Sequence, residues 1–213
     1  DIPMADYERH FEETQVPHSH ALHSRIRERG SYVVGPLARV NLNFRKLSRT
    51  AQEAARNSGH SFPNSNLFVS IVARAVEVVH TVEEALEIID PYAPPERPYV
   101  EVPRMDASAG DGGVLSGSWI TEAPRGILYH AYQVDRHGKI LKANIVPPTS
   151  QNLRAMEDDL RVYLPTLLDR SLDEMTHRCE ALIRNYDPCI SCSTHFLTLK
   201  IQRETAVRDE HPQ

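Results

Sequence analysis

The C-terminal third of the chain carries the clearest helical pattern. Apolar side chains recur at three- and four-residue steps from Leu153 to Tyr163 and again from Leu167 to Ile183, which is the spacing of one face of an α-helix. Pro165 lies between the two runs and predicts a break between two helices. Because a residue that precedes proline avoids the helical conformation, Asp187-Pro188 predicts that the second helix ends near Tyr186.

Two more helical patterns occur in the first half of the chain. The stretch from Leu37 to Arg56 shows the same period. The stretch from Ser65 to Ile89 is the longest, and its small and β-branched residues occupy most faces, so we expect this helix deep in the core. The proline-rich "DPYAPPERP" (90–98) that follows predicts a linker across the surface.

The remaining segments predict extended structure and turns. Residues 1–30 are polar and contain scattered histidines without a fixed ligand spacing, which indicates an extended or loosely helical surface segment with solvated side chains. "SYVVGPLAR" (31–39) predicts an extended run that stops at Gly35-Pro36. Two strand-like runs around "RHGK" predict a β-hairpin over 127–146, after the glycine- and serine-rich "SAGDGGVLSGSWI" (108–120). The predicted fold is therefore mainly α (α+β), with long buried helices and a small β-hairpin in a single domain.

Composition excludes several classes of protein. The 24 basic and 29 acidic residues are mixed along the 213-residue chain without a basic stripe, so a nucleic-acid partner is not expected. No apolar run is long enough for a membrane span, and no signal peptide is visible. The odd count of three cysteines argues against a disulfide framework and for a reducing, cytoplasmic location. The chain begins at Asp1 rather than methionine, so we expect further sequence upstream.

"DPCISCSTH" (187–195) is the segment with the most chemistry. Three interpretations of its Cys-x-x-Cys spacing compete. A thioredoxin-like dithiol normally lies near the start of a βαβ fold, whereas this one follows a long helix. A closed zinc site is also compatible with the ligand types; its ligands would be Cys179, Cys189, Cys192 and His195. However, Cys179 falls on the apolar helical series, where a buried structural cysteine is the default. The third interpretation is half of a larger thiolate site, completed by residues outside this chain.

Other motifs favour the third interpretation. "DPCISCSTH" resembles the C-terminal Asp-Pro-Cys-x-x-Cys-x-x-His motif of the catalytic large subunit of nickel–iron ([NiFe]) hydrogenases. "TEAPRGILYHAY" (121–132) and "NIVPPTSQN" (144–152) resemble two upstream motifs of this family, in the same order. "YVVGPLARVN" (32–41) is similar to a stretch in the cytosolic branch, which couples to NAD(P) or F420. The resemblance extends over essentially the whole chain.

The resemblance implies a set of metal ligands. The family holds a Ni-Fe centre, with CO and cyanide ligands on the iron, between four cysteines. By position, Cys189 would be a terminal nickel thiolate and Cys192 a nickel–iron bridge. His195 matches a ligand of a separate magnesium or iron site. The N-terminal cysteine pair of the family is absent from this sequence, so the resemblance implies the C-terminal half of a large subunit.

The resemblance also implies roles for neighbouring residues. Arg125 would lie over the open metal position, with Asp187 as its carboxylate partner. Thr149 would donate a hydrogen bond to a cyanide nitrogen, although the Pro147-Pro148 pair departs from the common motif. Pro124 would shape the apolar pocket around the diatomic ligands. Glu122 is expected to have a structural role, such as binding a neighbouring loop.

Partners follow from the same resemblance. H2 turnover at the Ni-Fe centre would pass electrons to a small subunit with Fe-S clusters, since this chain lacks the cysteines for one. Flavin-bearing NAD(P) or F420 subunits and the missing N-terminal half would complete the complex. Residues 196–213 are expected to be a C-terminal extension removed by a maturation endopeptidase. The alternative is a non-catalytic fragment, a scaffold or a complex-I-like relative. The complex-I-like relatives have lost the cysteine pairs, so the presence of Cys189 and Cys192 argues against a complex-I-like relative.

Overall fold

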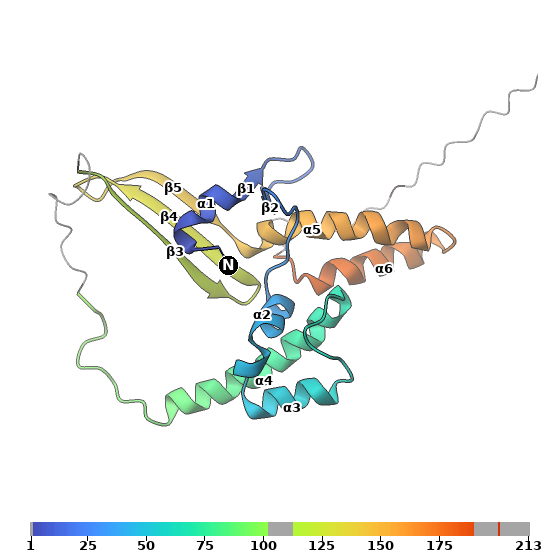
Figure 1. The fold of residues 1–213 in the computed structure, drawn as a ribbon, viewed down its shortest axis with the longest axis horizontal. Helices are drawn as coiled ribbons and strands as arrows, with labels where there is room; N and C mark the ends of the chain where they lie inside the picture. The colour runs from blue at the N-terminus through green and yellow to red at the C-terminus, as the bar shows by residue number, and fades with distance from the viewer. Residues whose placement is uncertain (1, 102–112, 190–199, 201–213) are drawn as a thin grey trace, which may run out of the picture.

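The computed structural model of the chain describes residues 2–101, 113–189 and 200. Helices predominate over strands within these ranges, which confirms the predicted fold class. In Figure 1, α5 and α6 lie beside one end of a small sheet, and α2, α3 and α4 form a second group below both. The main helices are α2 (Pro36–Asn43), α3 (Arg49–Asn57), α4 (Ser70–Ile89), α5 (Pro148–Tyr163) and α6 (Leu172–Asn185).

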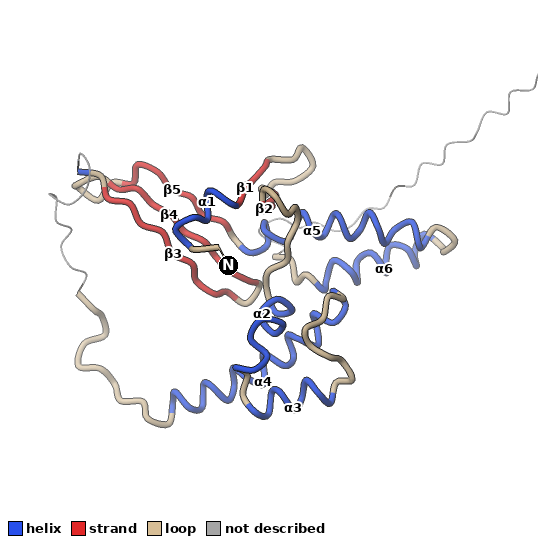
Figure 2. Tube along the Cα trace, in the orientation of Figure 1, coloured by secondary structure: helices blue, strands red, loops and turns tan. Residues whose placement is uncertain are grey.

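The sheet is antiparallel and has the strand order β3-β4-β5 (Figure 2). Its strands are β3 (Leu115–Ala123), β4 (Gly126–Val134) and β5 (Ile140–Val146). The hairpin predicted over 127–146 is confirmed by the pairing of β4 with β5. The pattern of the chain does not predict β3, because its glycine and serine residues obscure the alternation of apolar and polar positions.

The first core lies between α2, α3 and the N-terminal half of α4. Its buried residues are Leu37, Val40, Leu47, Ala51, Ala55, Ala73 and Val76. The helix expected from Leu37 to Arg56 is in fact two helices, separated by the short 3₁₀ helix η2 (Phe44–Lys46). The break occurs because Ser48 caps α3: its hydroxyl accepts a hydrogen bond from the Ala51 N–H group.

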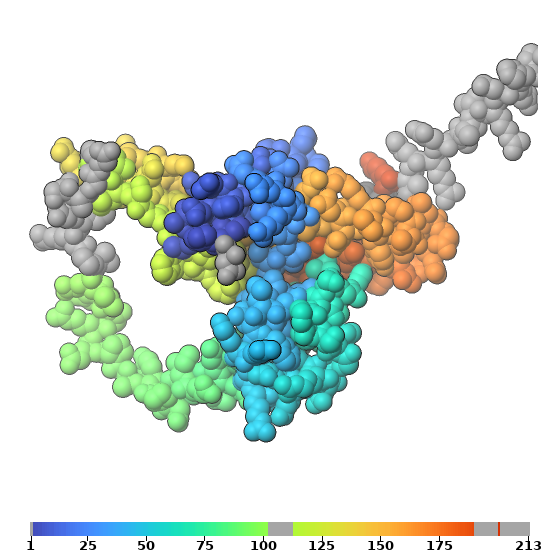
Figure 3. All heavy atoms as spheres, in the orientation of Figure 1, coloured from blue at the N-terminus to red at the C-terminus, as the bar shows by residue number. Residues whose placement is uncertain are grey.

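The expectation that the longest helix is buried on most faces is wrong. The 3₁₀ helix η3 (Leu67–Val69) precedes α4, and only Ser70, Ala73 and Val76 of α4 are buried. The opposite face exposes five large apolar side chains: Ile71, Val78, Val82, Leu86 and Ile89. Figure 3 shows the C-terminal half of α4 extending beyond α2 and α3. The exposure of these side chains shows that the described part of the chain leaves this face largely uncovered.

α5 and α6 pack against each other as the helical pattern predicts. The shared core contains Leu153, Ala155, Met156, Leu182 and Tyr186. The 3₁₀ helix η5 (Leu164–Leu167) contains Pro165 and separates the two helices, and α6 ends at Asn185 with Tyr186 as its C-cap. The predicted break at Pro165 and the predicted end near Tyr186 are therefore both confirmed.

The first 30 residues are more ordered than the sequence predicts. η1 (Met4–Asp6) and α1 (Tyr7–His10) precede a two-stranded sheet of β1 (Phe11–Thr14) and β2 (His23–Ile26). Tyr7 is buried and stacks on both Phe11 and Tyr129, with ring centroids 4.2 and 4.0 Å apart. The expected solvated surface segment is therefore a packed part of the fold, and its histidines include the buried His23.

Residues 93–101 contain no helix or strand and are exposed, as expected for a surface linker. Among the described residues, no helix combines the length and the apolar character that crossing a membrane requires.

Candidate functional site

The connection between β3 and β4 lies against the extended segment that precedes α2. Pro124 and Arg125 alone join the strands, since Ala123 pairs with Gly126. A Cβ atom on Gly35 would lie 2.8 Å from the Arg125 carbonyl oxygen, and one on Gly126 would overlap Val34. Both glycines also have positive φ angles, of 109° and 136°. This close crossing fixes the backbone from which the Arg125 side chain projects.

Arg125 reaches from this hairpin tip to the turn after α6. Its Nε atom donates a hydrogen bond to the carbonyl oxygen of Asp187 at 2.7 Å and lies 3.5 Å from Asp187 Oδ2. Arg74 of α4 approaches the same carboxylate, with 3.9 Å between its Nε atom and Oδ2. The structure thus brings together two predicted site residues that are 62 positions apart, and adds Arg74 to them.

The turn after α6 carries Cys189 toward the start of α5. The Asp187 N–H group donates to the Arg184 carbonyl, and Asp187 adopts a left-handed φ of 51°. This conformation is uncommon outside glycine but is tolerated by aspartate. The Cys189 N–H group then donates to the Thr149 hydroxyl at 3.4 Å. The Cys189 side chain is half-buried there.

Thr149 lies in a first turn of α5 that is polar and yet buried. Pro148 occupies the first helical position, where a missing N–H group costs no hydrogen bond. This placement explains why the unusual double proline is accommodated. Ser150, Gln151 and Asn152 follow, and each is at most 3% exposed.

These buried polar side chains connect the start of α5 to its neighbours. Gln151 donates to the carbonyls of Ile127 and Val146, at 2.7 and 3.2 Å. Asn152 accepts from the Val34 N–H group and donates to the Val34 carbonyl, at 2.8 and 3.2 Å. Because unpaired buried polar groups are costly, this set holds the segment before α2 and the sheet in one arrangement.

Arg39 of α2 supports the hairpin tip from the other side. All five of its N–H groups are used: two donate to the Glu77 carboxylate, one to Glu122, and two to the carbonyls of Ala123 and Pro124. Burial alone would lower the pKa of Arg39, but the hydrogen bonds to Glu77 and Glu122 raise it above its ordinary value. The guanidinium therefore remains charged and ties α2, α4 and the tip together.

Sequence reasoning does not assign Arg39, Arg74, Gln151 or Asn152. Arg39, Gln151 and Asn152 lie inside two of the quoted motifs, which was the available signal. Nothing local marks Arg74. Glu122 binds the Arg39 side chain of α2 rather than the neighbouring loop that was expected. Pro124 contributes its carbonyl oxygen to the same contact.

Two predicted ligands, Cys192 and His195, lie outside the described residues. Cys179 packs in a hydrophobic cluster with Leu167 and Met175, and burial raises the pKa of its thiol. This is the environment of an inert structural cysteine rather than of a metal ligand.

The described residues fit a thiolate-bound metal centre in one respect. They place the Cys189 backbone against the Thr149 hydroxyl, and Arg125 and Arg74 converge on the Asp187 carboxylate two positions earlier. The half-buried Cys189 thiol is a soft ligand of the kind that transition metals bind.

Comparisons with known proteins give this geometry a family context. The family described as nickel-dependent hydrogenase matches residues 8–195. This chain belongs to that family. Sulfhydrogenase 1 subunit alpha of Pyrococcus furiosus is 33% identical over 199 residues, which make up 93% of this chain and 45% of that protein. The NAD-reducing hydrogenase HoxS subunit beta of Cupriavidus necator is 35% identical over 90% of this chain and 40% of that protein.

Solved structures show that the fold is shared with this hydrogenase family. An NAD+-reducing nickel–iron hydrogenase in the H2-reduced state superposes with a TM-score of 0.69, over 90% of this chain and 43% of that chain, at 23% identity. The Ni-Fe-Se hydrogenase of D. vulgaris Hildenborough superposes with a TM-score of 0.56 over 81% and 37%. The chain thus spans less than half the length of these hydrogenases.

Proposed function

We propose that this chain is the C-terminal part of a hydrogenase large subunit that catalyses reversible H2 oxidation. The observation that supports this most strongly is the meeting of three distant segments: the Arg125 tip, the Thr149 helix start and the Asp187–Cys189 turn. These segments contain the three motifs that resemble the family.

The chain's own residues would hold one side of a Ni-Fe centre. Cys189 and Cys192 would hold the centre through their thiolates. Thiolates suit both metals and are deprotonated once bound. The two remaining cysteine ligands would come from a second segment, because this sequence has no further pair. His195 would bind a separate magnesium or iron ion.

Neighbouring side chains would assist the splitting of H2. When bound, a Ni-Fe centre would supply the acceptor for the hydride formed as H2 splits heterolytically. The Cys189 thiolate would take up the accompanying proton. Arg125 uses Nε on Asp187, which leaves its terminal NH2 groups without a partner among the described residues. They would face H2 and the CO and cyanide ligands, in a pocket bounded by Pro124. The Thr149 hydroxyl accepts from Cys189, so its proton is available for a cyanide nitrogen.

The exposed face of α4 is the proposed contact for the N-terminal part of the large subunit. The chain matches only 45% of the sulfhydrogenase subunit, so more than half of such a subunit remains to cover this face. Its five apolar side chains follow helical steps of three, four and seven residues. Burying each would contribute at most about 1.5–3 kcal/mol, which favours association of the two parts against its entropic cost.

Electrons would leave through a small subunit with Fe-S clusters. The relatives named as NAD-reducing and F420-non-reducing hydrogenases make further flavin subunits reasonable partners in the cytoplasm. A maturation endopeptidase would remove residues 196–213, which lie outside the described residues except for Lys200.

The test is reconstitution. The chain is co-expressed with the N-terminal half of a related large subunit and a small subunit, and H2-dependent reduction of a dye is measured. We expect nickel and iron close to one each per complex, with H2 turnover. A stable complex that lacks both metals would instead establish a non-catalytic scaffold.

A further inference from the structure

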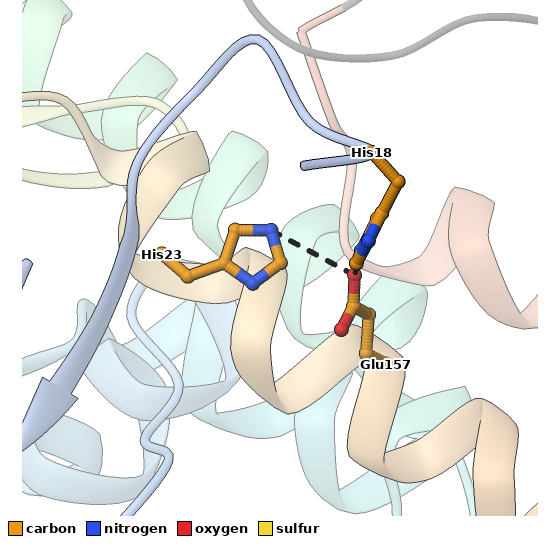
Figure 4. A group of neighbouring side chains, drawn as sticks. All are labelled: His18, His23 and Glu157. Carbon is orange, nitrogen blue, oxygen red and sulfur yellow. Dashed lines mark hydrogen bonds and ion pairs between the residues drawn. The ribbon is translucent and has the colours of Figure 1, made fainter. Parts of the chain in front are cut away.

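Two histidines and a glutamate converge at a place remote from the proposed thiolate centre in the sequence. His18 lies in the loop between β1 and β2, His23 begins β2, and Glu157 lies on α5. Figure 4 shows the two imidazole rings directed at the Glu157 carboxylate. The nearest ligand atoms of the three side chains all lie within 4.8 Å of one another.

The distances are close to those of a metal site. His23 Nε2 lies 3.7 Å from Glu157 Oε1, and two ligands of one tetrahedral zinc ion lie about 3.4 Å apart for bonds of about 2.1 Å. His18 Nε2 lies 2.5 Å from the same oxygen, which is the separation of a short hydrogen bond. Because the His18 side chain is 64% exposed on a loop, a movement of about 1 Å would admit an ion.

His23 is the residue that this arrangement leaves unsatisfied. Its side chain is only 3% exposed, and its Nδ1 atom has no hydrogen-bond partner in the described part of the chain. Its Nε2 atom lies 3.7 Å from Glu157 Oε1, which is too long for a hydrogen bond. Burial lowers the pKa of His23, although the charge of Glu157 opposes this.

The geometry points to a divalent transition-metal site, with zinc as its best occupant, formed by His18, His23 and Glu157. Two imidazoles and one carboxylate are a known zinc donor set that leaves a fourth position for water. Zn2+ would replace the proton between His18 and Glu157. Arg161, 3.7 Å from Glu157 Oε2, would orient the carboxylate from its other oxygen.

Such an ion would fasten the β1–β2 loop to α5. β2 leads into the segment that ends at Val34, whose N–H group donates to Asn152 of α5. Zinc binding would therefore also stabilise the first turns of α5, which contain Thr149. This inference does not depend on the proposed H2 chemistry.

The test is a Zn2+ titration of the full chain by isothermal titration calorimetry. Cys189→Ser and Cys192→Ser are introduced first, to remove thiolates that would compete. We expect one Zn2+ per chain, with affinity reduced at least about tenfold by His18→Ala or by Glu157→Gln. His60→Ala removes another exposed histidine and serves as the matched control, with unchanged affinity.

Thermal unfolding supplies a second readout. Zn2+ should raise the Tm of the parent chain but not that of His18→Ala or Glu157→Gln, because only the native state assembles the three ligands. Circular dichroism without metal checks that the variants are folded. No zinc binding by the parent, or equal affinity in the parent and both variants, would overturn the proposal.

Discussion

Replacing Arg39 with methionine should destabilise the chain by about 3 kcal/mol. The change keeps the length of the side chain but removes all five hydrogen bonds. Glu77 accounts for most of the loss, because its side chain is only 18% exposed and would keep an uncompensated charge. Glu122 is 51% exposed and contributes little, since water replaces its partner.

Thermal denaturation measures this effect. A loss of about 3 kcal/mol corresponds to a fall in Tm of about 6–12 °C for a chain of this size. Arg49→Met is the matched control: Arg49 is 94% exposed and pairs only with Glu53 on the same helix, so we expect less than about 0.5 kcal/mol. Adding Glu77→Gln to Arg39→Met should restore about 1 kcal/mol or more, because it removes the stranded charge.

A loss of unfolding free energy below about 1 kcal/mol for Arg39→Met would refute this reasoning. It would mean that the Glu77 carboxylate does not depend on the guanidinium for its compensation. The same conclusion would follow if Glu77→Gln gave no recovery.

Four other outcomes are expected. Gly35→Ala should lower the free energy of unfolding by at least about 2 kcal/mol, because its φ is 109° and its new Cβ would meet the Arg125 carbonyl. Urea unfolding measures this loss, and Gly117→Ala, where a Cβ would have open space, is the control. Burial raises the pKa of Glu13, so the stability it confers is full below about pH 4.5 and is lost as the pH rises through the folded-state pKa; Glu13→Gln should be more stable than the parent at pH 7 and similar to it at pH 4. Val82→Glu or Leu86→Glu should leave the free energy of unfolding of this chain unchanged within about 0.5 kcal/mol. Either change should nevertheless abolish co-purification with the N-terminal half, whereas Glu84→Ala should not. Intact-mass spectrometry of nickel-loaded enzyme should find a chain that ends at His195, and a mass that includes Gln213 would argue against processing.

Local sequence patterns predict the helix ends and turns that are determined by residues close to them in the sequence. The α5–α6 break follows from Pro165, and the β4–β5 turn follows from Gly138, which has a φ of 80°. The same turn holds Asp135, whose carboxylate accepts the N–H groups of His137 and Lys139. Such features depend on neighbours in the sequence and are therefore visible there.

Long-range contacts explain what the sequence does not predict. The apolar residues of α4 indicate burial, but the described chain covers only one face of the helix. The partners of Arg39 lie 38 to 85 positions away, so no local spacing indicates them. The contact between Arg125 and Asp187 was expected from the family's motifs, not from any periodicity of the chain.

Nickel content tests the central claim most directly. The reconstituted complex is purified with the parent chain, with Cys189→Ser and with Cys179→Ala, and nickel is quantified by mass spectrometry. The account predicts about one nickel per complex for the parent and for Cys179→Ala, and almost none for Cys189→Ser, together with loss of H2 turnover. Equal nickel in the parent and in Cys189→Ser, or loss of nickel in Cys179→Ala, would contradict it.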